Sequence, residues 1–323
     1  MNSLVNINFE DLYLGASVNK MRSPTGALQQ IPIEMLQDAH DILNQCRETR
    51  ASKGYSEFTI KISEVKYRVT AITNDAGSDL FVVSKSGGKP QDLSTLELPQ
   101  KALATIRNPD AKGLILVLGG QGVGKTTTVS SMMVERCKRF GHFGLTVEDP
   151  TECDLDGAHG AGHITQVDVA SVEGGFEGAL KRALRSRADV FMVSEIRARK
   201  TALEVLNFAP SGRLLLTTMH AETIEQGLQR LQEYCHADAS AQNSTAGRNS
   251  MLADALLMVV LLEVHVITEI GYTQPIKRRM AQALVFDGED SYAIKQNIRD
   301  GKFSNLRAYL DRQQEQLRWG GLD

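Results

Sequence analysis

The sequence has little of several features that mark particular classes of protein. Its four cysteines, Cys46, Cys137, Cys153 and Cys235, are widely spaced and form no CxxC pair, which argues against a secreted disulfide framework and favours a reducing compartment. No basic segment followed by an apolar one opens the chain, so no signal peptide is predicted. The formal net charge is only −3, and such a balanced chain is not predicted to bind nucleic acid strongly.

Long apolar segments are also missing. The longest run, from Ala255 to Leu262, is far too short to cross a bilayer, and we expect it to be a helix packed in the core. Any contact with a membrane is therefore expected to be peripheral. The 323 residues correspond to about two domains and can bury a substantial core.

The first third of the chain has the pattern of a small α+β domain. Apolar residues at helical spacing predict a helix from Pro32 to Arg50. Alternation of apolar and polar residues, together with turn signals, predicts three strands, at 58–62, 67–71 and 80–83. The Gly- and Pro-containing stretch 84–99 is the most linker-like part of the chain. We therefore predict an N-terminal domain over 1–99, with its linker at about 84–99, and a second domain over 100–323.

The segment from Gly119 to Thr128 reads GGQGVGKTTT and fits the phosphate-loop pattern of Gly, four residues, Gly-Lys-Thr. A buried strand is predicted before it and a helix after it, from about Lys125. The glycines let the backbone wrap around a phosphate, Lys125 reaches the β- and γ-phosphates, and the Thr126 hydroxyl can ligate Mg²⁺. We predict that the nucleotide is bound by Gly119, Gly120, Gln121, Gly122, Val123, Gly124, Lys125, Thr126 and Thr127.

Short apolar strands alternate with helices after this loop. Strands are predicted at 143–147, 190–193 and 214–217, and helices at 178–186, 200–208 and, charged and C-terminal, 297–318. This alternation predicts an α/β domain with a parallel sheet covered on both faces. Ligands of such sheets bind at the carboxyl ends of the strands.

Polar residues follow three of these predicted strands. Glu148, Glu195 and His220 each stand directly after a strand, where a ligand of the sheet would lie. Phosphoryl transfer needs a carboxylate that orients water, and Glu195 is the first candidate and Glu148 the second. Alternatively, Glu195 forms an ion pair with Arg197 or Arg199, and His220 is a hydrogen-bonded core residue.

A second group of polar residues invites a metal-site interpretation. His159 and His163 are four residues apart, and Cys153 is nearby. The glycines at 157, 160 and 162 instead predict a loop, which would not hold such ligands rigidly. We therefore disfavour a metal site there.

Four motifs occur in an order that one superfamily shares. They are the Walker A loop (119–128), an aspartate box (TVEDPTE, 146–152), a Walker B strand (ADVFMVSEIR, 188–197) and a histidine box (TTMH, 217–220). With them the chain resembles the secretion ATPase superfamily, which drives type II and type IV secretion and type IV pili. Residues 292–299 (YAIKQNIR) resemble the AIRNLIR stretch of the retraction motors, which favours the PilT-type retraction or DotB- and TraJ-type transfer branch.

The resemblance implies a RecA-like P-loop ATPase domain with C-terminal helices and a smaller N-terminal α+β domain of PAS-like type. It also implies ATP and Mg²⁺ as ligands, a homohexamer, a cytoplasmic location at the inner membrane and a polytopic membrane platform protein as partner. His220 would sense the γ-phosphate. Lys112 and Lys85 stand where the family has arginines that reach a neighbour's nucleotide, and lysine lacks the planar guanidinium fork, so hydrolysis is expected to be slow.

Two other functions fit the same motifs. The chain is alternatively a RecA-like nucleic-acid motor, because a fold does not fix a function. A nucleotide-regulated assembly protein with little hydrolysis is the third possibility, and the two lysines favour it. The sequence does not separate retraction from transfer.

Overall fold

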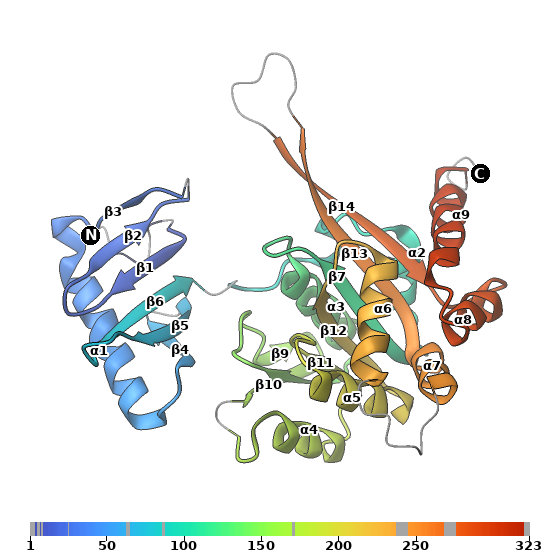
Figure 1. Ribbon diagram of the computed structural model, residues 1–323, viewed down its shortest axis with the longest axis horizontal. Helices are drawn as coiled ribbons and strands as arrows, with labels where there is room; N and C mark the ends of the chain where they lie inside the picture. Colours follow the sequence, from blue (N-terminus) through green and yellow to red (C-terminus); the bar gives the residue numbers. More distant parts are fainter. Residues whose placement is uncertain are drawn as a thin grey trace. The chain divides into compact units, whose positions relative to one another are not determined.

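The structure is a computed structural model, which describes residues 4, 7, 9–24, 26–62, 65–85, 88–169, 172–236, 245–267 and 276–319. The chain forms two compact units (Figure 1). The first comprises residues 1–89 with the short segments 149–154 and 168–171, and the second comprises the remainder.

The first unit is a six-stranded antiparallel sheet with one long helix. The sheet has the order β3-β2-β1-β6-β5-β4. Its elements are β1 (Asp11–Leu14), β2 (Asn19–Arg22), β3 (Leu28–Gln30), the 3₁₀ turn η2 (Ile33–Met35), α1 (Leu36–Lys53), β4 (Glu57–Ile62), β5 (Val65–Thr73) and β6 (Asp79–Lys85). The three strands predicted here are β4, β5 and β6, whereas β1, β2 and β3 were not predicted.

Helix α1 forms because its apolar residues return every three or four positions. Ala39, Ile42, Leu43 and Cys46 are buried. The helix ends at Gly54, whose φ of 74° is a left-handed conformation that glycine adopts without strain. The predicted helix is confirmed, although its first turn is the η2 turn.

The second unit is built on an eight-stranded sheet with the order β14-β13-β7-β12-β11-β8-β10-β9. Its strands are β7 (Gly113–Gly119), β8 (Phe143–Glu148), β9 (Gly157–His159), β10 (Gly162–Asp168), β11 (Val190–Val193), β12 (Leu214–His220), β13 (Leu256–Ile267) and β14 (Ile276–Val285). The five strands β13, β7, β12, β11 and β8 are mutually parallel. Strand β14 is antiparallel to β13, with which it forms a long ribbon (Figure 1).

Helices pack against this sheet. They are α2 (Gln100–Ile106), α3 (Lys125–Phe140), α4 (Gly175–Arg185), α5 (Arg199–Phe208), α6 (Ile224–His236), α7 (Thr245–Ala255), α8 (Ser291–Arg299) and α9 (Leu306–Trp319), with 3₁₀ turns η3 (Leu93–Thr95), η5 (Ala209–Ser211) and η6 (Phe303–Asn305). Helix α3 packs on β7, β11 and β12, and α4 packs on β8. The five apolar residues of β7 at 114–118 are fully buried. The predicted α/β class is confirmed.

The prediction of a helix from Ala255 to Leu262 is wrong. Ala255 ends α7, and the residues from Leu256 onward form β13, between β7 and β14. A strand buried on both faces is a continuous apolar run, so its pattern does not distinguish it from a buried helix. The expected core position is correct, since Leu256 and Leu261 are buried. Within the described ranges, no helix is both long and apolar enough to span a membrane.

The C-terminal helical prediction is correct in type but wrong in continuity. The expected helix at 297–318 is two helices, α8 and α9, separated at residues 300–305 by a turn and the η6 turn. The turn carries Gly301 at a φ of 71°, a conformation that interrupts a helix.

Candidate nucleotide-binding site

The parallel strands bring several predicted site residues to one edge of the sheet. His220, the last residue of β12, is paired with Gly119, the last residue of β7. On the other side of β12, β11 pairs with β8, which ends at Glu148. Glu195 follows β11 by two residues. The edge is the carboxyl end of the strands, where ligands of α/β sheets bind.

The phosphate-type loop joins β7 directly to α3. Gly119 lies so close to the neighbouring strand that a Cβ there would be 2.5 Å from the carbonyl oxygen of Leu262, so no larger residue fits without movement. Gly124 caps α3 with a φ of 99°, which also favours glycine. The first N–H groups of α3 have no partner within the helix, and they follow this turn at the edge of the sheet.

Lys125 is the first residue of α3 and is 8% exposed. Its ammonium group donates to the carbonyl oxygens of Gly120, at 2.6 Å, and Gly119, at 3.1 Å. The Nδ1 atom of His220 is 3.5 Å from the same ammonium nitrogen. A lysine has no acceptor, so Nδ1 is the unprotonated nitrogen of His220 if the two are hydrogen-bonded. The positive charge is therefore fixed over the loop.

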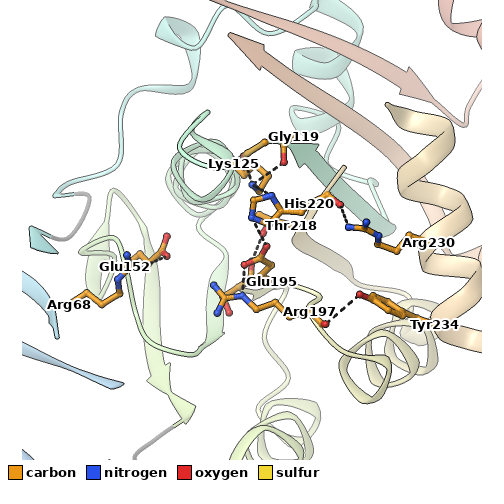
Figure 2. A network of polar contacts seen from close by, with 12 residues as sticks. Arg68, Gly119, Lys125, Glu152, Glu195, Arg197, Thr218, His220, Arg230 and Tyr234 are labelled. Atoms are coloured by element: carbon orange, nitrogen blue, oxygen red, sulfur yellow. Dashed lines mark hydrogen bonds and ion pairs between the residues drawn. The ribbon is translucent and has the colours of Figure 1, made fainter. Parts of the chain in front are cut away.

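His220 links Lys125 to Glu195 (Figure 2). Its Nε2 atom lies 3.4 Å from Oε1 of Glu195, and Oε2 of Glu195 is 2.6 Å from Nε of Arg197. The Glu195 side chain is 13% exposed, whereas those of His220 and Arg197 are 47% and 63% exposed. The alternative ion pair between Glu195 and Arg197 is thus present, but it leaves Oε1 directed at His220. The core-residue interpretation of His220 does not fit its exposure.

Glu148 lies at the same edge but is completely buried. Its Oε1 atom accepts from the Thr146 hydroxyl, at 2.7 Å, and from Nε2 of Gln166, at 2.8 Å. The Gln166 side chain in turn accepts from the backbone N–H of Leu155, at 2.8 Å. The sequence analysis missed Gln166 because no pattern announced β10, the strand that carries it.

The two lysines at the positions of the family's arginines have different surroundings. Lys112 is exposed and precedes β7, at the opposite end of that strand from the loop. Lys85 is partly buried: its ammonium donates to the carbonyl oxygen of Ile7 at 2.5 Å and lies 4.8 Å from the centre of the Phe9 ring. This burial lowers the pKa of Lys85 below its usual value. Neither lysine is brought to the loop of its own unit by these contacts.

A hollow lies beside the loop, on the side of β13 and β14. It is lined by Thr95, Glu97, Val123, Thr128 and Arg279, among others. A Cβ atom on Gly124 would be 3.8 Å from the Arg279 guanidinium carbon, so this cation lies next to the loop. Arg279 belongs to β14, a strand that sequence patterning did not reveal.

The residues of the disfavoured metal site form a β-hairpin rather than the predicted loop. Strands β9 and β10 pair with Gly162 opposite His159 and with His163 opposite Ala158. Nε2 of His159 lies 2.7 Å from the carbonyl oxygen of Leu155. In the described part of the chain, no three His, Cys, Asp or Glu residues are grouped as metal ligands would be.

A parallel sheet whose strand β7 leads through a GGQGVGKT loop into α3 defines a P-loop nucleotide-binding fold of RecA type. The model of the Type II/IV secretion system protein family matches residues 42–269, and the chain belongs to this family.

Individual relatives agree with the family. The Type IV pilus ATPase PilU of Pseudomonas aeruginosa is 29% identical over 242 residues, which cover 72% of this chain and 62% of PilU. This chain thus matches less than two thirds of PilU. Two solved structures share the fold. The ATPase DotB of Legionella pneumophila has a TM-score of 0.74 at 19% identity, covering 94% of this chain and 84% of DotB. The pilus retraction motor PilT with bound ADP has a TM-score of 0.75 at 23% identity, covering 94% and 86%.

Proposed function

We propose that this protein is an ATP-hydrolysing motor of a type IV pilus or a type IV secretion or transfer machine. The observation that carries the proposal is the continuous contact from Lys125 through His220 to Glu195 at the carboxyl edge of the sheet. A cation, a neutral imidazole and a carboxylate in this order can bind phosphates and activate water. The names of the relatives, an ATPase of type IV pili and a retraction motor, give the cellular setting.

In this mechanism Lys125 binds the β- and γ-phosphates, and the N–H groups at the start of α3 bind the α- and β-phosphate oxygens. Glu195 orients a water molecule and accepts its proton as the water oxygen bonds to the γ-phosphorus and the bond to ADP breaks. His220 lies between these groups and senses the γ-phosphate. The Thr126 hydroxyl, half-buried one residue after Lys125, is a hard oxygen donor and suits Mg²⁺. Bound there, Mg²⁺ would neutralise phosphate charge.

We assign the water-orienting role to Glu195 rather than Glu148. Both carboxylates lie at the edge, but Glu148 is fully buried and its Oε1 atom accepts two hydrogen bonds from Thr146 and Gln166. Glu195 is partly exposed and its Oε1 atom faces His220. Glu148 instead holds the segment after β8 through Gln166.

We further infer a ring of six subunits that work at the cytoplasmic face of the inner membrane with a polytopic platform protein. Support comes from Lys112, which is exposed and lies at the far end of β7 from its own loop, so it suits a neighbour's site. A head-to-tail contact between identical subunits closes into a ring when the rotation allows it.

A nucleotide-regulated assembly protein with little hydrolysis is the second candidate. One observation favours it: Lys85 is occupied by the carbonyl oxygen of Ile7 and the ring of Phe9 rather than extended into solvent. In this case ATP would bind and stabilise an assembly, and turnover would be minimal.

The test is Mg²⁺-dependent ATP turnover combined with nucleotide binding. Lys125→Ala is expected to abolish hydrolysis and greatly weaken ATP binding, whereas Lys138→Ala, in the last turn of the same helix, should do neither. Glu195→Gln should bind ATP normally and lose roughly 10²-fold in turnover, with the exposed Glu233→Gln as control.

Four results would change the proposal. Wild-type turnover in Lys125→Ala would refute the site, and an inactive Glu148→Gln beside an active Glu195→Gln would reverse the two roles. Nucleotide binding without turnover in the wild type would favour the assembly protein. Stimulation by DNA at a stated salt concentration would instead indicate a nucleic-acid motor.

A further inference from the structure

Glu195 lies beyond the regular part of the sheet. Strand β11 ends at Val193, which is paired with Val147 on one side and Thr217 on the other. Ser194 continues toward the edge through one more backbone bond, from its N–H to the carbonyl oxygen of Val147 at 3.1 Å. Something other than regular strand pairing must therefore fix the backbone of Glu195.

Thr218 of β12 binds the chain on both sides of Glu195. Its hydroxyl donates to the carbonyl oxygen of Ser194 at 2.7 Å, and its own carbonyl oxygen accepts from the N–H of Ile196 at 2.8 Å. The residues before and after Glu195 are thus both attached to one residue of the neighbouring strand, which also leads to His220. Figure 2 shows Thr218 between His220 and Glu195.

The hydroxyl bond is the one of these contacts that a side chain makes, and it is shielded from water. Thr218 is 1% exposed, so water cannot readily replace its hydroxyl at the Ser194 carbonyl. Loss of the donor would leave that carbonyl unpaired and let the peptide before Glu195 rotate. A displacement of about 1 Å at a reacting group can cost on the order of 10²-fold in rate.

We propose that Thr218 is a positioning residue, whose hydroxyl fixes the backbone of Glu195 so that its carboxylate faces His220 and the phosphate loop. The proposal rests on the proposed function, because it assumes that Glu195 orients the attacking water. Thr218 itself contacts neither nucleotide nor water in this role.

Thr218→Val is the direct test, because valine has nearly the shape of threonine but no donor. It is expected to lower kcat by about 10-fold or more while the KM for ATP and the affinity for ADP change by less than about twofold. Thr218→Ser keeps the hydroxyl and should retain most of the turnover. If valine instead distorts the sheet, comparing Thr218→Ala with Thr218→Ser isolates the hydroxyl, since both remove methyl volume.

A matched control separates this effect from the general loss of a buried hydroxyl. The Thr105 hydroxyl of α2 also donates to a backbone carbonyl oxygen, that of Lys101 at 2.9 Å, and Thr105 is 6% exposed. Thr105→Val should therefore show a comparable change in thermal stability without a comparable loss of kcat. Equal losses of kcat in the two valine variants would make the Thr218 effect merely structural.

The double variant with Glu195→Gln gives the decisive result. If Thr218 acts through Glu195, Thr218→Val should cause almost no further loss of turnover once the carboxylate is gone, whereas an independent effect would multiply. An inactive Glu195→Gln together with a fully active Thr218→Val would overturn the inference alone. A fully active Glu195→Gln would instead overturn the assignment of Glu195 on which it depends.

Discussion

The location of Lys112 allows a quantitative test of a shared active site. Seven residue steps of extended chain separate Lys112 from Gly119, where the loop begins, which corresponds to roughly 23 Å along β7. A lysine side chain extends only about 6 Å. Lys112 therefore cannot contact a phosphate on the loop of its own subunit, and any contribution to hydrolysis must come from a neighbouring subunit.

Mixing two inactive variants measures this contribution. Lys125→Ala subunits lack the loop lysine but keep Lys112, and Lys112→Ala subunits have the reverse defect. In rings assembled at random from equal amounts, a competent site needs a normal loop from one subunit and a normal Lys112 from the next. About one quarter of the sites satisfy both conditions, whatever the number of subunits, so turnover should recover to about one quarter of the wild-type value per subunit.

The assay is ATP turnover after co-purification of the two variants through different affinity tags, which proves that mixed assemblies exist. Mixtures of Lys125→Ala with Lys138→Ala control for the number of intact loops. Wild-type activity in Lys112→Ala alone would remove this lysine from the mechanism. Absence of recovery in proven mixed assemblies would refute the shared site.

Two further predictions concern the folded chain. Arg136→Met should lower the free energy of unfolding by about 3 kcal/mol, measured by urea denaturation, because the buried guanidinium donates to three carbonyl oxygens, those of Ile106, Asn108 and Pro109. Arg139→Met, on the same helix but exposed and paired only with Glu135, should cost less than about 1 kcal/mol, and equal costs would contradict the argument. Burial raises the pKa of three thiols, to about 12 for Cys46 and Cys137 and about 11 for Cys235. Thiolate is therefore scarcer in the folded than in the unfolded chain at pH 8, and all four buried cysteines should react with a disulfide reagent only after unfolding; rapid labelling of the native protein would disprove this.

Local pattern was sufficient for the elements whose signal lies within a few residues. The loop from Gly119 to Thr128 announces both the strand before it and the helix after it, because glycine spacing and the flanking apolar residues are local properties. Helix α1 and strand β5 follow from periods of 3.6 and 2, since each has one buried face. The order of strands ending in Glu148, Glu195 and His220 likewise predicted that these side chains share one edge.

Tertiary structure decided what depends on pairing between distant segments. Strand β13 was predicted as a helix because a run that is apolar on every side carries no period, and only its place between β7 and β14 makes it a strand. Arg279 reaches the loop at Gly124 because β14 pairs with β13, far along the sequence from the loop. Thr218 binds Ser194 because β12 lies beside β11, although 24 residues separate them. The sequence alone determined which groups are available for phosphate chemistry, whereas the packing of non-local strands determined which side chains hold those groups in place.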